Sequence, residues 1–263
     1  MTYSIVAKGR EDIGMRRTSN QDEIILLPNK KFYAVSDGMG ALISGGETSQ
    51  MVKLLLSKAI EASSLNLEEV RKPEYIGEKL KEIIIEVNNK IYEAGKDVGR
   101  DRFGATLSCV WIDGSNAIFA NVGDSRGYIF TSGQLQQVTK DHNLAAYLVE
   151  KGEITAEEAI NHPSSSRLLK YMGKKPPLVP DIFIEPLTSN CEILLCSDGL
   201  YGMLDNNEIA AILTESKSNV VDELIDAAND AGGNDNISVV HIKVDLVINE
   251  EKPRGHEENG KHI

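Results

Sequence analysis

Acidic residues beside glycine or amide residues recur along the chain, and most of them stand at the end of an apolar run. The motifs are Asn20-Gln21-Asp22, Ser36-Asp37-Gly38-Met39-Gly40, Gly123-Asp124-Ser125-Arg126, Ser197-Asp198-Gly199 and Gly233-Asn234-Asp235-Asn236. Carboxylates at strand ends can meet at one edge of a sheet, where they repel one another unless cations lie between them. The set therefore indicates a site for two or more hard metal ions.

The chemistry of such a site follows from its ligands. Carboxylate, amide and backbone carbonyl oxygens suit Mg²⁺ or Mn²⁺, and two such ions lower the pKa of a shared water so that it can attack a phosphoryl group. An arginine would hold the phosphate oxygens, and Arg16 and Arg17 stand just before Asp22. Glycine after Asp37 and Asp198 would let metal and substrate approach the backbone.

Each motif taken alone also has a purely structural interpretation. Asp-Gly is first of all a turn signal, and Asn234-Asp235-Asn236 could form an Asx turn that leads into a strand. A structural role explains any single motif better than it explains the ordered set, in which two Ser-Asp-Gly sequences follow apolar runs.

The elements that must position these residues can be read from apolar periodicity. Strands are expected at 3–8, 22–27, 32–36, four times within 104–138, and at 181–185, 192–196 and 236–247, with Pro28-Asn29-Lys30 as a hairpin turn. Helices are expected at 206–214 and 218–231 and on two earlier stripes. Those stripes are Met51, Leu54, Leu55, Ala59 and Ile60, then Leu80, Ile83, Ile84, Val87, Ile91 and Tyr92.

This order of elements predicts an α+β fold, a four-layer αββα sandwich in which helices flank two antiparallel sheets. The polar stretch at about 144–175 is expected to be an inserted helical flap beside the site. Residues 1–247 are expected to form a single domain, followed by a charged tail at 248–263 that has too little apolar content to fold alone.

Composition excludes several classes of protein. The net charge of −12 argues against a nucleic-acid partner, which would favour a basic face. No apolar run approaches the roughly 20 residues that span a bilayer, and the N-terminal residues do not have the pattern of a signal peptide. Cys109, Cys191 and Cys196 are expected to be buried free thiols. A cytoplasmic protein without a membrane partner is expected.

The ordered motifs resemble those of the metal-dependent protein serine/threonine phosphatases of type 2C, in their compact bacterial form. The resemblance runs from about Tyr3 to Leu246. It rests on Asp12-Ile13-Gly14-Met15-Arg16-Arg17-Thr18-Ser19-Asn20-Gln21-Asp22, Asp37-Gly38-Met39-Gly40, Phe103-Gly104-Ala105-Thr106, Val122-Gly123-Asp124-Ser125-Arg126, Thr139-Lys140-Asp141-His142, Cys196-Ser197-Asp198-Gly199-Leu200 and Asp235-Asn236-Ile237-Ser238-Val239.

The resemblance implies a metal centre at one end of the sandwich, between the sheets. It implies that Asp37 bridges two Mn²⁺ or Mg²⁺ ions and that the Gly38 carbonyl binds one of them. Asp198 and Asp235 would complete the coordination of the first ion, and Asp22 would bind the second ion, partly through water.

Two further residues receive roles from the resemblance. Asp124, together with Asp198, would hold a third and looser ion. Arg17 would grip the phosphate, since it stands five residues before Asp22 as the family pattern requires. Arg17 and Asp37 are thus the implied catalytic residues.

The implied reaction is hydrolysis of phosphoserine and phosphothreonine in proteins without a covalent intermediate, opposing a cognate serine/threonine kinase. Two departures from the family pattern stand out. The loop Ala41-Leu42-Ile43-Ser44-Gly45-Gly46 has no histidine, and in the flap Leu169 and Lys170 replace the usual Thr and Arg. His142 is expected to have a structural role.

Two alternatives stay open from the sequence. A catalytically weak or inactive module could bind phosphoproteins or a regulatory partner, and a phosphatase of small phosphorylated metabolites could use the same centre.

Overall fold

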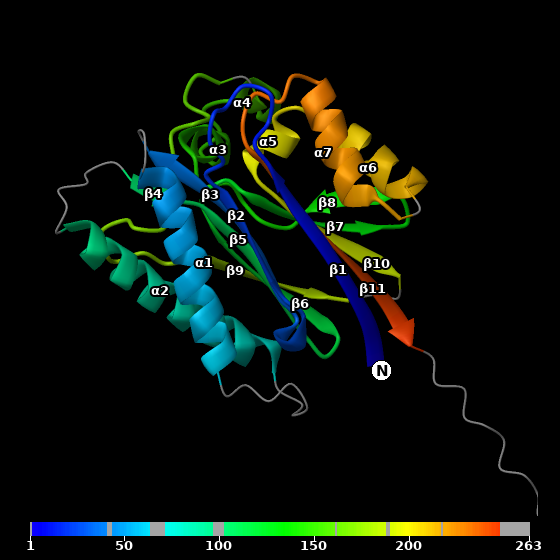
Figure 1. Ribbon diagram of the computed structural model, residues 1–263, viewed down its shortest axis with the longest axis horizontal. Coiled ribbons are helices and arrows are strands. Elements are labelled where there is room, and N and C mark those ends of the chain that lie inside the picture. Colours follow the sequence, from blue (N-terminus) through cyan, green and yellow to red (C-terminus); the bar gives the residue numbers. More distant parts are fainter. Residues whose placement is uncertain are drawn as a thin grey trace, which may run out of the picture.

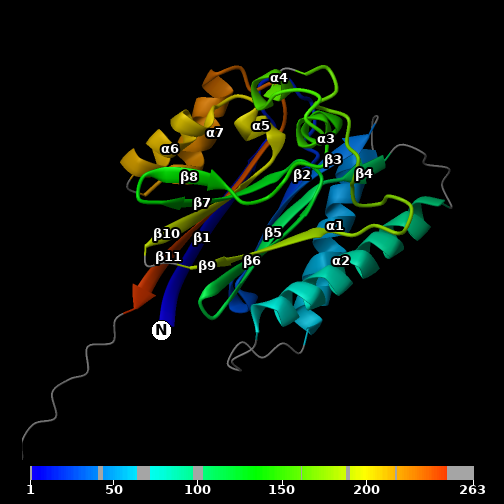
Figure 2. The ribbon, with the colours of Figure 1, turned by 180° about the vertical axis from the view of Figure 1, so that it is seen from behind.

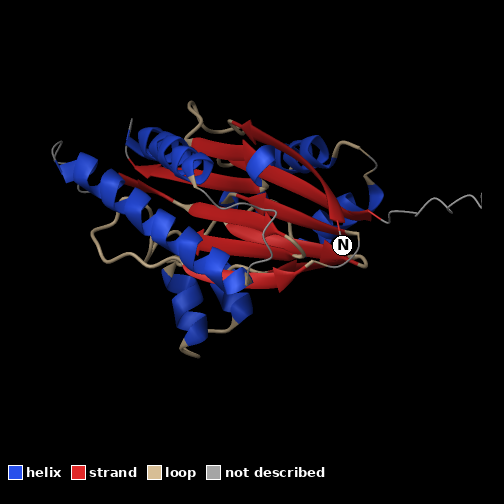
Figure 3. Ribbon diagram, turned by 90° about the horizontal axis from the view of Figure 1, so that it is seen from below, coloured by secondary structure: helices blue, strands red, loops and turns tan. Residues whose placement is uncertain are grey.

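The structure is a computed structural model that describes residues 2–40, 44–63, 72–96, 103–160, 162–187, 190–216 and 218–247. Within these residues two antiparallel sheets pack face to face, and helices cover the outer face of each (Figure 3). The predicted charged tail at 248–263 lies outside the described residues. Among the described helices, none is both long and apolar enough to cross a membrane.

The first sheet has the strand order β1-β11-β10-β7-β8. The strands are β1 (Thr2–Asp12), β11 (Ile237–Val247), β10 (Cys191–Cys196), β7 (Arg126–Thr131) and β8 (Gln134–Gln137). β1 and β11 pair along their whole length, from Thr2 opposite Val247 to Asp12 opposite Ile237. This ladder places the segment that follows β1 beside the segment that precedes β11.

The second sheet has the order β2-β3-β5-β6-β9, with β4 paired to β3. The strands are β2 (Asp22–Leu27), β3 (Phe32–Gly40), β4 (Phe103–Ala105), β5 (Leu107–Asp113), β6 (Asn116–Val122) and β9 (Asp181–Pro186). A short 3₁₀ turn, η1 (Pro28–Lys30), joins β2 to β3 where the hairpin turn was predicted.

β3 is longer than predicted. The apolar run ends at 36, but the strand continues to Gly40 because β4 pairs with it, with Gly38 opposite Ala105. The prediction that Asp37 stands just beyond a strand was therefore wrong, and Asp37 lies within one. A long-range partner strand, which has no signature in the local sequence, decides this boundary.

Helices α1 (Ser44–Ala62) and α2 (Pro73–Lys96) pack on the second sheet, and α5 (Asp198–Tyr201), α6 (Asn206–Glu215) and α7 (Val220–Asp230) pack on the first (Figures 1 and 2). The region predicted to form a flap contains α3 (Leu144–Glu150) and α4 (Ala156–Ile160), which lie near α5 at the upper end of the sandwich in both views. The predicted four-layer αββα arrangement is confirmed.

The central strands β5, β6 and β10 are buried on both faces, which explains why they read as nearly continuous apolar runs. Tyr33 and Val110 of one sheet meet Leu195 and Val240 of the other between the sheets. Trp111, predicted to be core, is fully buried under the α1 and α2 layer, where it makes an edge-to-face contact with Phe32 at 5.9 Å between ring centroids. The three cysteines are free and buried, as predicted.

The predicted apolar stripe of α1 is confirmed in part, since Ile60 is completely buried and Met51 and Leu55 pack against the core. Val52, Leu56 and Ile60 are completely buried, whereas Leu54 is 68% exposed. The helix carries adjacent apolar ridges, so that its apolar face is wide and the sequence alone does not fix the centre of that face. The α2 stripe agrees with the prediction, with Leu80, Ile84, Val87 and Ile91 buried.

Candidate metal centre

Strand register brings the first two aspartates together. In the β2–β3 hairpin, Asp22 is the residue directly opposite Asp37. The two backbones are also hydrogen-bonded beyond this pair, since the Gly38 N–H donates to the Gln21 carbonyl at 3.0 Å. Opposed positions on antiparallel strands hold their Cβ atoms close together, so the hairpin fixes two facing carboxylates.

The other sheet supplies Asp198 and Asp235. β10 and β11 end side by side, and beyond their last pair the Ser197 N–H donates to the Ser238 carbonyl at 3.1 Å. A side chain on Gly199 would place its Cβ 2.0 Å from the carbonyl oxygen of Asn236. Glycine at position 199 is thus required by close packing of these two backbone segments, rather than by the approach of a metal or substrate.

Asp124 comes from the turn between β6 and β7, which joins the two sheets. Gly123 has φ +104°, and a Cβ there would lie 2.7 Å from the Thr106 side chain. Asp124 is only 7% exposed, and Asp22 only 3%. The carboxylates of both sheets are therefore brought to one end of the sandwich, as the sequence predicted.

The electrostatics of the cluster show the cost of holding these groups together. Burial is the main cause that raises the pKa of Asp22 to about 7, and the charge of Asp198 adds to it. The pKa of Asp124 is also raised to about 7, mainly by burial and then by the charges of Asp198 and Asp141. Burial and Asp235 raise the pKa of Asp198 to about 6. The pKa of Asp37 is raised well above its usual range, by burial and then by the neighbouring aspartates.

The residues fit a cluster of divalent cations. Both carboxylate oxygens of Asp22 and Oδ1 of Asp198 are buried without a hydrogen-bond partner. Orphaned buried carboxylate oxygens are costly, and a hard cation satisfies them. In the described part of the chain no group of three Asp, Glu, His or Cys side chains is already arranged to hold a metal ion.

Arg17 and Asp235 stand at the exposed side of the cluster. The Arg17 guanidinium donates to Asp235 at 2.6 Å, and the side chains are 51% and 36% exposed. Arg16 is exposed. Arg17 is thus placed where a substrate phosphate could replace or share its carboxylate partner.

Asn236, which the sequence suggested only as part of a motif or an Asx turn, holds the Arg17 segment. Its side-chain amide donates to the carbonyls of Ile13 and Ser19 at 2.9 and 3.0 Å, and its Oδ1 accepts from the Gln21 N–H at 2.9 Å. Asp235 Oδ1 accepts from the N–H of the next residue, Asn236, which is not the bond to the second residue on that defines an Asx turn.

A buried hydroxyl network behind Asp37 was also missed. Thr106 Oγ1 accepts from the Asp37 N–H at 2.9 Å and lies 2.6 Å from the Ser125 hydroxyl. The Thr106 N–H donates to the Asp37 carbonyl, and Ser36 donates to the Thr106 carbonyl. The sequence carries no specific signal for this role, because small polar residues also occur in ordinary turns and strands.

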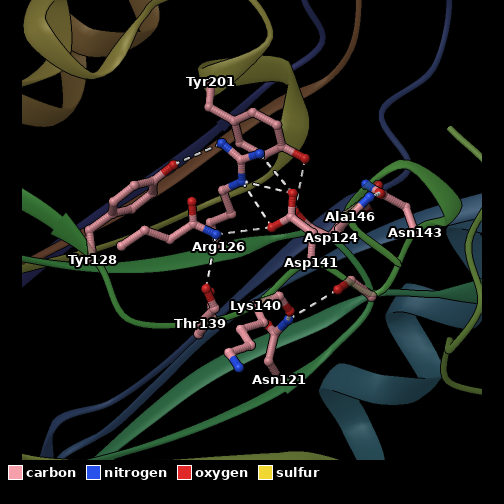
Figure 4. Close-up of polar contacts among 12 residues, drawn as sticks. Asn121, Asp124, Arg126, Tyr128, Thr139, Lys140, Asp141, Asn143, Ala146 and Tyr201 are labelled. Atoms are coloured by element: carbon pink, nitrogen blue, oxygen red, sulfur yellow. Dashed lines mark hydrogen bonds and ion pairs between the residues drawn. The ribbon is translucent and has the colours of Figure 1, made fainter. Parts of the chain in front are cut away.

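Arg126 forms the support behind Asp124 (Figure 4). Its guanidinium binds both oxygens of Asp141 and lies 3.6 Å above the Tyr201 ring. Tyr201 closes the α5 helix that begins at Asp198, and its hydroxyl donates to the Asp124 carbonyl at 2.9 Å. This cluster therefore fixes Asp124 relative to the helix that carries Asp198.

His142 has the structural contacts expected for it. Its Nδ1 accepts from the Gly123 N–H at 3.2 Å, and its Nε2 lies 3.2 Å from Asp181, which also binds Lys170 at 2.5 Å. The His142 contact, followed by Lys170, lowers the pKa of Asp181. Lys170, at a position where relatives often have arginine, thus links the flap to Gly123. The altered loop at 41–43 lies outside the described residues.

A family model described as protein phosphatase 2C matches residues 15–238. The chain belongs to the protein phosphatase 2C family. The match covers the segments that carry Arg17 and every aspartate of the cluster.

Named relatives extend over nearly the whole 2C domain. The serine/threonine phosphatase stp of Listeria monocytogenes is 36% identical over 246 residues, which is 91% of this chain and 96% of that protein. The protein phosphatase PhpP of Streptococcus pneumoniae is 34% identical over 239 residues, or 89% and 95% of the two chains.

Solved 2C phosphatase structures share the fold. The serine/threonine phosphatase of S. agalactiae matches with a TM-score of 0.83 and 34% identity, over 91% of this chain and 99% of that one. The catalytic domain of the phosphatase PstP, in complex with two manganese ions, matches with a TM-score of 0.80 and 27% identity, over 93% and 100%.

Proposed function

We propose that this protein serine/threonine phosphatase hydrolyses phosphoserine and phosphothreonine by direct attack of water at a centre of divalent cations. The observation that carries the proposal is the cluster of aspartates from both sheets, in which both oxygens of Asp22 and Oδ1 of Asp198 are buried without a hydrogen-bond partner. The family and the named phosphatases among its relatives support the reaction class.

The proposed ligands divide between the sheets. Asp37 would be a ligand to two ions, with the Gly38 carbonyl as a further ligand. Asp198 and Asp235 would complete the coordination of one ion, and Asp22 would be a ligand of the other. Mn²⁺ or Mg²⁺ would supply Lewis-acid activation of water and balance the developing charge on the phosphoryl oxygens. We assign Asp124 with Asp198 to a third ion, because both lie within one buried cluster.

The roles of the remaining residues follow from their places. Arg17 would bind the phosphate oxygens at the exposed side of the cluster, and residues 144–175 would form a flap within one catalytic domain at 1–247. Phosphorylated proteins are the proposed substrates and a cognate serine/threonine kinase the opposing enzyme. The free thiols favour a reducing, cytoplasmic location.

The first test is phosphate release from a phosphothreonine peptide as Mn²⁺ is titrated. We expect metal-dependent release that is lost in Asp198→Asn and retained in Asp222→Asn, a control at an exposed aspartate paired only with Arg10. Absence of release from the folded wild-type protein at every Mn²⁺ and Mg²⁺ concentration would overturn the proposal and favour a phosphoprotein-binding module. Release from small phosphorylated metabolites but not from the peptide would change the substrate class.

Replacing Arg17 is expected to weaken substrate binding more than turnover. Arg17→Lys keeps the charge but removes the planar fork, so we expect KM to rise roughly tenfold with kcat changed much less. Arg16→Ala is the matched control and should behave as wild type. Steady-state kinetics on the phosphothreonine peptide would measure both constants, and an equal effect of the two variants would count against the assignment.

A further inference from the structure

Asn88 is a polar residue in an apolar setting. It lies in α2 between Ile84 and Ile91 on the face that packs on the second sheet, and its side chain is completely buried. Asparagine is a mediocre helix former, and burying an amide costs free energy unless its groups are hydrogen-bonded. Packing of α2 alone therefore does not account for this residue.

Both polar atoms of the Asn88 side chain bind the end of the flap. Its Oδ1 accepts from the Gly173 N–H at 2.8 Å, and its Nδ2 donates to the Lys174 carbonyl at 3.0 Å. Gly173 has φ +91°, and a Cβ there would approach Ile91 to 3.2 Å. The last residues of the flap are thus seated directly on the helix.

The same flap segment is joined to the metal centre. Met172 exchanges two backbone hydrogen bonds with Ala105, at 2.7 and 3.1 Å. The next residue, Thr106, accepts from the Asp37 N–H and donates to the Asp37 carbonyl. Met172 is therefore held by Ala105, the neighbour of Thr106, through bonds that do not involve Asn88.

A second attachment lies a few residues earlier in the flap. Lys170 binds Asp181, and the Leu169 N–H donates to the His142 carbonyl. Between these two attachments the segment has no helix or strand of its own beyond the single bridge at Met172. Loss of the Asn88 contacts would leave the Gly173 N–H buried and unpaired and would free the end of the flap.

We propose that Asn88 is a positioning residue that fixes the end of the flap, residues 172–174, and through it the placement of the flap over the polypeptide part of the substrate. This rests on the proposed function for its kinetic consequence. The phosphate itself is held by Arg17 and the metal centre, so a substrate without a polypeptide should be insensitive to Asn88.

The test compares Asn88→Leu with Ile84→Val, a control that trims the same buried face one turn earlier. For Asn88→Leu we expect the KM for a phosphothreonine peptide to rise about tenfold, as for loss of one well-placed buried hydrogen bond. The kcat/KM for p-nitrophenyl phosphate should stay within about twofold of wild type. Hydrogen exchange at the amides of 172–174 should accelerate in this variant alone.

Equal losses on both substrates, or unchanged exchange at 172–174, would overturn the proposal. If Asn88→Leu does not fold, Asn88→Ser is measured in the same way and should give a smaller change of the same kind. If the wild type releases phosphate from neither substrate, the proposed function fails, while the exchange measurement still decides whether Asn88 anchors the flap.

Discussion

Replacing Asp37 by asparagine should stabilise the metal-free protein while abolishing its phosphatase activity. Burial and the charges of Asp22, Asp198, Asp124 and Asp235 all oppose ionisation of Asp37 and raise its pKa. A neutral amide of nearly the same shape relieves that repulsion, so the folded state no longer has to hold this carboxylate against its neighbours. The same change removes the proposed bridging ligand. A residue whose ionisation the folded state opposes is thus one on which the reaction depends.

The two effects are measured separately. In EDTA the Tm of Asp37→Asn should exceed that of wild type by roughly 2–6 °C, since about 1 kcal/mol moves the Tm of a domain of this size by roughly 2–4 °C. Turnover with saturating Mn²⁺ should fall by roughly 10³-fold, in line with the several kcal/mol that metal ions supply. Asp222→Asn should change neither. If the metal-free Asp37→Asn variant had a lower Tm than the metal-free wild type, favourable contacts of the carboxylate would outweigh the repulsion, and the prediction would be wrong.

The stability of the metal-free protein should fall as pH rises from about 4 to about 7. Asp22 and Asp124 have pKa values raised to about 7 and Asp198 to about 6, whereas an unfolded aspartate titrates near 3.9. Between these values the folded state binds more protons than the unfolded state, so unfolding becomes easier with rising pH. The contribution is complete below about pH 4 and is lost above about pH 7.

Mn²⁺ should reverse this trend, because the ions compete with protons for the same oxygens. Thermal unfolding from pH 4.5 to pH 8, in EDTA and in Mn²⁺, would show two curves that diverge as pH rises. The Tm gained from Mn²⁺ should grow most between about pH 6 and about pH 7. In Asp22→Asn the metal-free curve should be flatter than in wild type. A metal-free protein that gains stability over this range would contradict the shifted values.

The sequence was sufficient to place the carboxylates but not to predict how they are held. Asp22, Asp124 and Asp198 follow or precede apolar runs, so the ends of the buried strands could be recognised from the local pattern of apolar residues. The opposition of Asp22 and Asp37 is a matter of strand register, and the extension of β3 to Gly40 depends on a partner strand from residues 103–105.

The supporting residues were harder to foresee for a similar reason. Asn236 and Thr106 use their side chains as substitutes for backbone hydrogen-bonding groups of distant segments. Nothing in their immediate sequence distinguishes such a role from an ordinary turn or strand residue. Leu54 of α1 was predicted to be buried but is exposed, because the helix has a wide apolar face and the sheet beneath it decides which residues lie at its centre.

The pairing of β1 with β11 bears on how the protein is made. That ladder joins Thr2 to Val247, and the segment between Asp12 and Asp22 depends on Asn236 for its anchoring. A ribosome-bound chain that has emerged only as far as α5 would contain Arg17, Asp37 and Asp198 but would lack β11 and Asn236, which hold the Arg17 segment. Contacts this distant along the chain are slow to form. Residues 236–247 must therefore be synthesised before the Arg17 segment can be anchored, and until then a partly made copy lacks a complete centre.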